Sequence, residues 1–560
     1  MGRGMARRAL SAVVAVAALC TTTGLGPATA LPPPTVPLRL IAFGDLHGNL
    51  LPPEGPRSEV VRSDGESVPA GGAAYLAAYV RQLRGQAEHS VLYSVGDTWG
   101  SSPLESAMFH DEPTIELLND LDLTAAALGN HEFDNGYTEV RRLRDGGCHP
   151  EQGCRYSDSF RGADFPFLGA NVTNVDGTPA ALPFSINYID GIPVGVIGVL
   201  PRNTPEYIRA DAIEGLQFGD EIEAVDRTAD ILDALGVRAL VLLYKGDLRA
   251  GEGADKCSTD GNATHVATNV SPKVDVIVTS DGESHFNCSY PDALGNPRTV
   301  LQGASHGRII SVADLSIDRK SRDVLRDHTV AFNQVITHDI EPDPQTRQFV
   351  DRAVGESSDV AGRPVGRITD HLVREPSHSG ESPLGNLVAD AQLAAAEPFG
   401  AQIALTNPGG IRADLTYTGD GTVTFGQTYA VQPFGNRVQV LELTGAQIDA
   451  VLEQQFQEEV SGRPLERILA PSHTLRYTLD RLAPRGERIR DISIAGTPLI
   501  PETTYSVAVN GFLADGGDGF SVFSEAQRRT GAGHELDALN AYLSDRAPVK
   551  PPATDRIDLH

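Results

Sequence analysis

Three short apolar runs, each followed at once by glycine and polar side chains, constrain this chain more than any other feature. The runs cover residues 38–43, 90–95 and 123–128, and they lead into the sequences GDLHGN, GDT and GNHEFD. Short apolar runs bounded by glycine and aspartate are typical of buried β-strands. In open α/β sheets, ligands gather beyond the carboxyl ends of the strands, so the polar groups after these three runs should converge on one edge.

The turn after the third run is crowded with polar groups. It presents the amide of Asn130, the imidazole of His131 and the carboxylates of Glu132 and Asp134. Unpaired polar groups at the end of a buried strand are costly, so these side chains need partners, and a metal ion is a good one. For this turn alone, a solvated acidic loop is the alternative. The two upstream motifs add further ligands and favour the metal site.

The length of 560 residues exceeds the size at which one core keeps growing, so we expect two domains. Strand-like and helical runs alternate up to about residue 315, which predicts a layered α/β domain built from a sandwich of sheets. The sequence EPDP and the residues after it predict a proline-started helix between two cores. The predicted boundaries are 36–335 for the first domain, 336–360 for the linker helix and 361–560 for the second domain.

Residues 1–30 have the composition of a secretory signal. Arg3, Arg7 and Arg8 precede an apolar core over residues 9–20, and the small residues at 28–30 offer a cleavage site. The core is too short to act as a stable membrane anchor. We therefore expect a secreted, periplasmic or extracellular protein.

The net charge limits the partners of the chain. It is −28 at pH 7, and loss of the signal would leave about −31. Such a surface repels nucleic-acid polymers and anionic lipid, so neither is an expected partner. A phosphorylated substrate would have to meet local positive charge, supplied by metal ions or by a few arginines.

The cysteines that remain after the signal form two near pairs, Cys148 with Cys154 and Cys257 with Cys288. An even number of cysteines in an exported protein predicts two disulfides. A zinc site is the alternative.

The order of the motifs resembles known enzymes. GDLHGN, GDT and GNHEFD, followed by a distant GESH, resemble the calcineurin-like metallophosphoesterases. The later sequences GESPLGNLVADA, TNPGGIRADL, PFGN and GGDGF look like the C-terminal domain of the secreted 5′-nucleotidase family, which includes periplasmic UDP-sugar hydrolase. The resemblance covers nearly all of the mature chain. It implies a four-layer α/β/β/α N-terminal domain, a linking helix, a second α+β substrate-specificity domain and a monomer.

The resemblance also implies a centre of one or two divalent ions. In the family pattern one metal is held by Asp45, His47, Asp97 and the last histidine of a GHxH motif, here His285. Asp97 would bridge to a second metal, which Asn130 and two more histidines hold. Paired cations bind phosphoryl oxygens, lower the pKa of a bound water and stabilise charge in an in-line displacement.

Catalytic and substrate-binding residues follow from the same resemblance. His131, oriented by Asp134, looks like the family's catalytic dyad, which stabilises the transition state or the leaving oxygen. Arg412 can clamp a phosphate, and Phe434 and Phe520 look like the pair that sandwiches a nucleobase. The implied substrate-binding residues are Asn407, Gly410, Arg412, Phe434, Asn436 and Phe520.

The chain departs from the pattern at the second metal. Tyr244 and Glu283 stand where the family has the two other histidines, and Lys245 could put an ammonium near the vacated position. Glu283 is a competent ligand, whereas a neutral tyrosine is a poor one. His306, where the family often has an aromatic residue, is a further candidate.

Three interpretations of the second metal site stay open. The site could bind a hard cation such as manganese, magnesium or calcium through Asp97, Asn130 and Glu283. The centre could instead work with one metal, zinc included, or the chain could be a hydrolytically weak relative. The sequence therefore leaves two functions: a secreted metal-dependent phosphoesterase acting on 5′-nucleotides, with cyclic nucleotides or nucleotide sugars as further substrates, or an extracellular nucleotide-binding protein with a degraded metal site.

Overall fold

A computed structural model describes residues 34–54, 58–62, 65–246, 257, 262–282, 284–458 and 464–560, with side chains of the helix at 262–269 described from residue 265. The signal predicted at residues 1–30 and Glu283 lie outside the described residues. Residues 35–560 make one compact unit. Within the described part of the chain, no helix combines the length and apolar character needed to cross a membrane.

The three predicted strands are confirmed and lie side by side in one sheet. They are β1 (Thr35–Phe43), β4 (Ser90–Val95) and β5 (Ala125–Ala127), which are parallel neighbours, so their carboxyl ends share one edge. Parallel β6 (Phe167–Leu168) follows β5, and antiparallel β15 (Ile309–Asp318) and β16 (Val330–Val335) complete the other side. The sheet, called sheet A below, has the order β16-β15-β1-β4-β5-β6.

A second six-stranded sheet, called sheet F below, has the order β13-β14-β12-β11-β9-β8. Its strands are β8 (Phe184–Ile189), β9 (Ile192–Val199), β11 (Ala239–Lys245), β12 (Val276–Ser280), β13 (Phe286–Pro291) and β14 (Pro297–Gln302). β9, β11, β12 and β14 are parallel, and β8 and β13 are antiparallel edges. Sheet F therefore also has parallel strand ends that can carry ligands.

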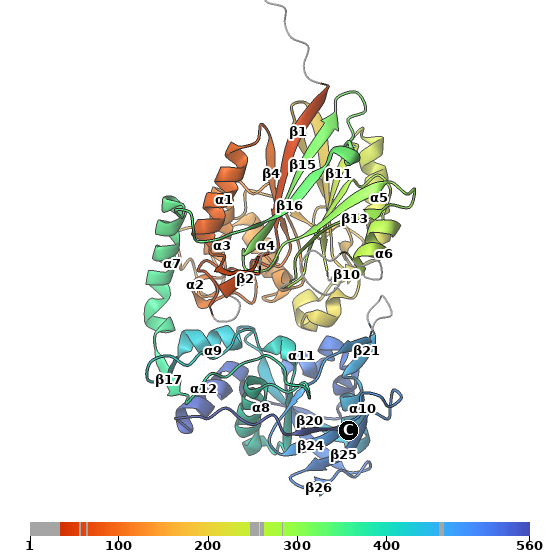
Figure 1. Cartoon of the computed structure of the whole chain (residues 1–560). Coiled ribbons are helices and arrows are strands. Elements are labelled where there is room, and N and C mark those ends of the chain that lie inside the picture. Colours follow the sequence, from red (N-terminus) through yellow and green to blue (C-terminus); the bar gives the residue numbers. More distant parts are fainter. Residues whose placement is uncertain are drawn as a thin grey trace, which may run out of the picture. The chain divides into compact units, whose positions relative to one another are not determined.

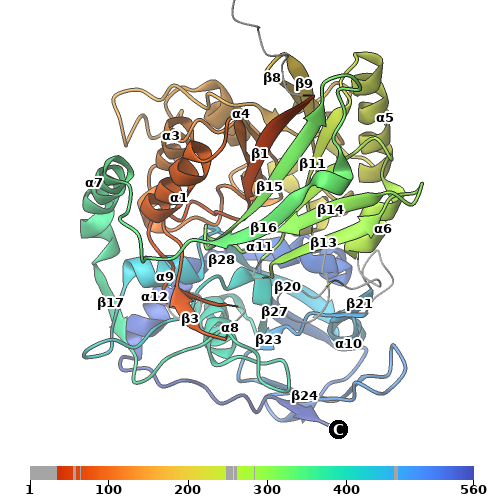
Figure 2. The same cartoon turned by 45° about the horizontal axis from the view of Figure 1, so that its top comes forward.

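The two sheets pack face to face, with helices on the outside (Figures 1 and 2). Successive side chains of a strand point to opposite faces. Accordingly, Leu38, Leu40 and Ala42 of β1 join the core between the sheets, whereas Ile41 and Phe43 join the core under the helices. The helices over sheet A are α1 (Ala73–Gly85), α3 (Glu112–Asp120), α4 (Tyr137–Asp145) and α7 (Pro344–Ala361); α5 (Glu221–Ala234) and α6 (Asn262–Asn269) cover sheet F. This is the expected four-layer α/β/β/α arrangement.

The predicted proline-started helix is confirmed as α7. Asp343 caps it by accepting a hydrogen bond from Thr346 N, and Pro344 occupies its first turn, where no N–H is needed. Val350 and Ala353 pack into the core under the helices of sheet A. The predicted domain boundaries on either side of α7 stay predictions.

The chain after α7 mixes helices with two larger sheets and two short two-stranded ones. A five-stranded sheet has the order β23-β18-β27-β20-β28 and a four-stranded sheet the order β26-β25-β24-β29. Their strands are β18 (Ile403–Thr406), β20 (Arg437–Thr444), β23 (Ala470–Pro471), β24 (Leu475–Leu479), β25 (Ile489–Ile494), β26 (Thr497–Pro498), β27 (Thr504–Asn510), β28 (Arg529–His534) and β29 (Ile557–Leu559). The helices are α8 (Pro383–Ala396), α9 (Phe425–Val431), α10 (Gly445–Glu453), α11 (Gly511–Ala514) and α12 (Glu535–Asp545). The mixture agrees with the predicted α+β character.

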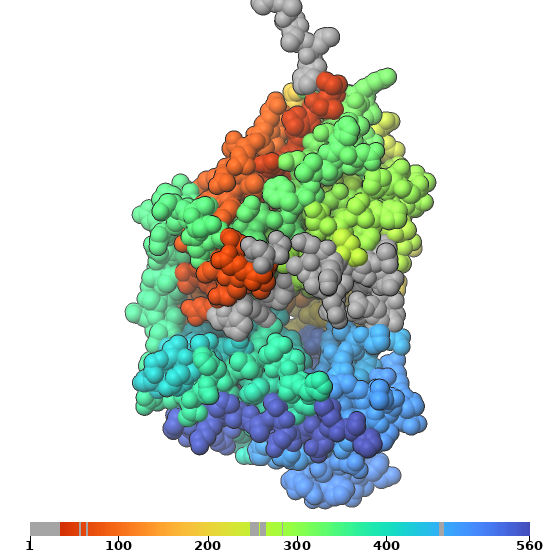
Figure 3. Space-filling model, viewed as in Figure 1, coloured from red at the N-terminus to blue at the C-terminus, as the bar shows by residue number. Residues whose placement is uncertain are grey.

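Buried Glu381, from the GES sequence, fastens the last strand of the chain. It accepts hydrogen bonds from the backbone of Arg556 and Ile557 and from the side chain of Asn386. The C-terminal segment appears as a dark blue band across the surface in Figure 3, and β29 ends it by pairing with β24. The glutamate of this motif therefore has a structural role.

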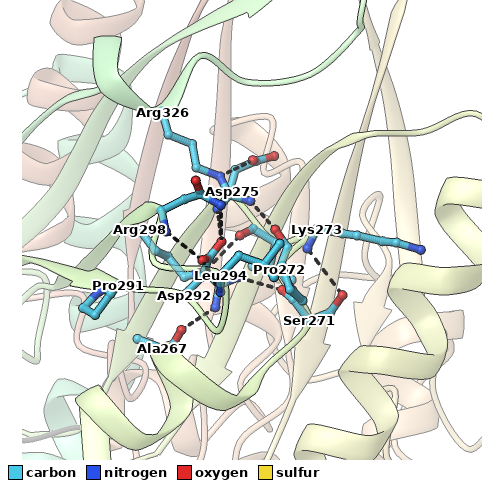
Figure 4. A network of polar contacts seen from close by, with 12 residues as sticks. Ala267, Ser271, Pro272, Lys273, Asp275, Pro291, Asp292, Leu294, Arg298 and Arg326 are labelled. Atoms are coloured by element: carbon cyan, nitrogen blue, oxygen red, sulfur yellow. Dashed lines mark hydrogen bonds and ion pairs between the residues drawn. The ribbon is translucent and has the colours of Figure 1, made fainter.

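A buried polar network fixes the amino ends of β12 and β14 (Figure 4). The guanidinium of Arg298 donates to the carbonyls of Ala267, Val270, Ser271 and Val274. Arg326 forms ion pairs of 2.7 and 2.8 Å with Asp275 and Asp292. Buried charges need partners of this kind, and the network holds the end of sheet F that is remote from the carboxyl ends of its strands.

Both predicted disulfides are present, Cys148–Cys154 and Cys257–Cys288. The zinc alternative for these cysteines is therefore wrong. The second disulfide joins residue 257 to β13.

Candidate active site

A cavity of about 830 Å³ lies at the carboxyl ends of β1, β4, β5 and β11. Its lining brings together most of the predicted site residues, which are Asp45, His47, Asp97, Asn130, His131, Asp134, Asn407, Gly410, Arg412, Phe434 and Asn436. His306, the further candidate, also lines it. Residues far apart in the sequence therefore share one cavity, as the motif order predicts, although the role of each residue stays a prediction.

The turns after β1 and β4 interlock. The backbone N–H groups of Asp45 and His47 donate to the carbonyls of Gly96 and Asp97. Asp45, His47 and Asp97 all have φ near +50°, a left-handed conformation that is strained for these residues and is typical of functional sites. The interlocked turns fix the three side chains against one another.

His47 is held as a neutral imidazole. Its Nδ1 lies 3.0 Å from the carbonyl oxygen of Gly100, which leaves Nε2 as the ring nitrogen for a ligand. Burial, and then the neighbouring His131, lower the pKa of His47 well below its usual value. A neutral imidazole is the form that binds metals.

Glu132 ties the turn after β4 to the turn after β5. Its buried carboxylate accepts hydrogen bonds from the backbone N–H groups of Asp97 (3.0 Å), Thr98 (2.6 Å) and Gly129 (2.5 Å). Burial, and then the charge of Asp97, raise the pKa of Glu132 to about 8, and the three donors oppose this shift. The sequence places Glu132 among the crowded polar groups of this turn but gives it no role of its own.

The two residues of the predicted dyad lie in hydrogen-bond contact. His131 Nδ1 lies 2.9 Å from Asp134 Oδ2, and the backbone N–H of His131 donates to Asp97 Oδ1. The Phe434 ring stacks on the His131 ring, with centroids 5.8 Å apart. Arg412 lies beside the same phenylalanine and donates from Nε to Ser101 Oγ. The dyad, the arginine and one aromatic ring are therefore neighbours.

The edge of sheet F contributes an ammonium group. Lys245, the last residue of β11, has its Nζ 3.0 Å from Asp45 Oδ1 and 3.0 Å from Asp97 Oδ2. Its side chain is only 6% exposed. Burial by itself would lower the pKa of Lys245, but the carboxylates of Asp45 and Asp97 raise it well above its usual value. The lysine is therefore a buried cation shared by two carboxylates.

The two carboxylates respond differently to this cation. Burial raises the pKa of Asp45 and outweighs the attraction of Lys245. For Asp97 burial acts in the same direction, but Lys245, His131 and His47 together lower its pKa below the usual value. The pKa of Asp97 thus shifts in the opposite direction to that of Asp45, although both aspartates contact the same ammonium.

Known proteins resemble this chain in sequence and in structure. The family described as "5′-nucleotidase, C-terminal domain" matches residues 364–525. A 5′-nucleotidase precursor from Thermus thermophilus has a similar structure, with a TM-score of 0.76, 26% identity and coverage of 93% of this chain and 99% of that one. The chain belongs to the 5′-nucleotidase family.

Curated relatives match this 5′-nucleotidase family member over different shares of their own length. The Listeria monocytogenes cell wall protein Lmo0130 is 29% identical over 91% of this chain and 67% of its own length. The Bacillus subtilis endonuclease YhcR is 29% identical over 86% of this chain but only 37% of its own length. Snake venom 5′-nucleotidase from Gloydius brevicauda is 24% identical over 87% of this chain and 83% of its own length.

The donors of the nucleotidase site fit one divalent ion better than two. His47, Asp97 and His131 each offer a ligand atom, and these atoms lie within 4.8 Å of one another. On the other side, the Lys245 ammonium already contacts Asp45 and Asp97. A second divalent cation between the same two carboxylates would meet a like charge at close range.

The positions of the missing histidines explain part of this arrangement. Tyr244 packs mainly in the core under α5 and α6, and its hydroxyl lies 3.4 Å from Glu221 Oε1. His285 does not line the cavity among the described residues, so the geometry gives its metal role no support. His285 stands directly before β13, and Asp281 lies 3.8 Å from Lys245 Nζ.

The aromatic pair predicted from the glycine-rich sequences needs a correction. Phe520 is 0% exposed in the core of the second half, so it cannot stack on a base. Phe512, at the start of α11, lines the cavity instead. Both residues flank the same GGDG sequence, and only the three-dimensional packing decides which of them faces the cavity. Phe434 keeps its predicted place in the lining.

Asn407, predicted to bind substrate, belongs to a hydrogen-bonded group of polar residues at the cavity. Asn407 receives a hydrogen bond from Asn510 and donates one of 2.7 Å to Asp518, whose pKa is raised by burial. Arg374 donates to the carbonyls of Ile411 and Arg412. Asn407 is therefore a member of a buried chain of side chains, and Arg374 supports the turn that carries Arg412.

Proposed function

We propose that this chain is an exported phosphoesterase that hydrolyses 5′-nucleotides to nucleoside and phosphate. The observation that carries the proposal is the single cavity that joins the His131–Asp134 dyad and Asp97 to Arg412 and Phe434. These groups suit a phosphate and a base on one ligand. Nucleotidases and a cell wall protein among the relatives support both the substrate class and the export.

Each residue has a chemical task in this proposal. Arg412 binds the phosphate, because a guanidinium offers paired N–H donors to phosphate oxygens. A divalent ion at His47 and Asp97 would supply further positive charge to the phosphoryl oxygens. His131, held by Asp134, donates a hydrogen bond or a proton to the leaving oxygen of the nucleoside. The base stacks on the aromatic lining, where Phe434 and Phe512 are available.

The test is phosphate release by the purified protein from AMP, cyclic AMP and UDP-glucose, with added manganese or zinc. We expect release from AMP that a chelator stops. If no member of the panel yields phosphate in the presence of either metal, the proposal is wrong.

A second function, nucleotide binding without turnover, is favoured by one observation: Lys245 is paired with two of the predicted metal ligands. It predicts AMP binding by calorimetry that weakens in Phe434→Ala and in Arg412→Ala, with no phosphate released. Catalytic turnover of AMP would contradict it.

A further inference from the structure

The position of Lys245 has a consequence for the metal content of the protein. Its ammonium carries three N–H groups. Nζ has three close oxygen neighbours, which are Asp45 Oδ1 and Asp97 Oδ2, both at 3.0 Å, and the carbonyl of Ser280 at 3.2 Å. The ammonium therefore forms one hydrogen bond, to Ser280, and two ion pairs within the protein. The lysine is placed to hold the two aspartates rather than to bind a phosphate.

The oxygens of both aspartates are engaged as well. Asp45 Oδ2 accepts a hydrogen bond of 2.8 Å from the backbone N–H of Gly282, and Asp97 Oδ1 accepts one of 2.9 Å from His131 N. The remaining oxygen of each aspartate faces Lys245. The contact of Asp45 Oδ1 with the ammonium is an ion pair rather than a hydrogen bond, and two buried acidic groups share one internal cation.

The strand β11 and the turn after β4 fix the position of the Lys245 side chain. Lys245 ends β11, and its stem packs closely on the turn after β4, where a Cβ on Gly96 would lie 2.9 Å from the lysine Cγ. Gly96 has φ +88°, a conformation suited to glycine. The long aliphatic stem is therefore enclosed, and the ammonium has a fixed position.

We propose that Lys245 is a built-in cation that replaces a second metal ion between Asp45 and Asp97, so that the chain binds at most one divalent ion. A divalent ion between these oxygens would face the fixed ammonium, and like charges in a buried site repel strongly. One ion remains compatible with the structure, at His47 and Asp97 beside the dyad histidine. The inference concerns the same site as the proposed function. It rests on that function only for the interpretation of the site as catalytic.

The first experiment measures metal per chain, without substrate. The purified protein is loaded with excess manganese or zinc, desalted and analysed by plasma mass spectrometry. We expect no more than one ion per chain. A stable content of two ions would overturn the inference. This measurement needs no variant, so it stands even where a substitution fails to fold.

The second experiment removes the cation. Lys245→Met leaves two buried carboxylates without their internal partner, so we expect a lower Tm in chelator and a larger rise in Tm on adding manganese than the wild type shows. Lys273→Met is the matched control, because Lys273 pairs with Asp230 and Asp233 on the surface. If the two variants respond to chelator and manganese alike, Lys245 is not the replacement cation.

A third variant tests the reverse change. Tyr244→His with Lys245→Leu removes the ammonium and supplies an imidazole at the cavity, so metal content per chain should rise above that of the wild type. No rise in a folded double variant would contradict the inference. These results separate it from the proposed function: one ion without hydrolysis contradicts only the function, and two ions with hydrolysis contradict only the inference.

Discussion

The two sheet edges that meet at the cavity use different chemistry. The edge of sheet A presents Asp45, His47, Asp97 and the dyad histidine from the ends of three adjacent parallel strands. The edge of sheet F presents the ammonium of Lys245. The first edge offers ligands for a cation, whereas the second supplies a cation of its own.

The difference shows how a site can change charge without changing fold. A lysine at the end of β11 contributes a positive charge that needs no cofactor, and it neutralises carboxylates of the opposite edge. A metal ion provides positive charge and open coordination positions, but an ammonium provides only charge and hydrogen bonds. Any chemistry that depends on ligand exchange must therefore come from the edge of sheet A.

The largest effect should follow from Asp97→Asn, because Asp97 is the residue that both edges share. The variant removes a carboxylate next to His47 and His131 and deprives Lys245 of one partner. We expect kcat/KM for AMP to fall by about 10³-fold, at the upper end for loss of one charge-stabilising group. Asp190→Asn, at an exposed turn, is the control. A loss below about tenfold would show that Asp97 does not act in the reaction.

His131→Ala tests the edge of sheet A without touching Lys245. Loss of a positioned acid or hydrogen-bond donor costs about 10²-fold or more, so kcat should fall while KM changes little. Asp134→Asn keeps the shape of the side chain but weakens its contact with His131 Nδ1. The kcat of this variant should lie between those of His131→Ala and the wild type. Unchanged kcat in both variants would remove the dyad from the mechanism.

The sequence predicted the edge of sheet A well because its information is local. Each apolar run and the polar turn after it are adjacent in sequence, and parallel strands align their ends. The edge of sheet F depends on contacts between residues that are distant in the sequence. The contact of Lys245 with Asp45 and Asp97 requires the packing of one sheet on the other, and the place of His285 depends on the length of a loop.

The aromatic residues show the same limit. Phe512 and Phe520 stand on either side of one glycine-rich turn, and a motif cannot show which of them the core buries. Their burial is set by contacts with strands and helices that are distant in sequence, such as those of the core around Phe520. Local patterns thus identified the loop correctly but chose the wrong side chain within it.

Substitutions of the phenylalanines test the comparison between the two sheet edges further. Phe434 stacks on His131 and so belongs to the side of sheet A. Phe434→Ala and Phe512→Ala should each weaken AMP binding by about 1–3 kcal/mol, the usual contribution of one stacking ring. Phe520→Ala should instead lower the free energy of unfolding by about 3–5 kcal/mol, as for other buried aromatics. Calorimetry and denaturant unfolding measure the two quantities. Weakened AMP binding by a stable Phe520→Ala would reverse the assignment.

The smallest effect should come from Asp281→Asn, on the edge of sheet F. Asp281 lies 3.8 Å from Lys245 Nζ, and its side chain is 41% exposed, so water already screens its charge. Exposed ion pairs contribute about 1 kcal/mol or less, and we expect less than about a threefold change in kcat/KM. Asp45→Asn is the paired variant, because Asp45 contacts the same ammonium at 3.0 Å from a buried position, and it should cost far more. Equal losses of kcat/KM in the two variants would mean that three carboxylates share the ammonium equally. The division proposed here between the two sheet edges would then be wrong.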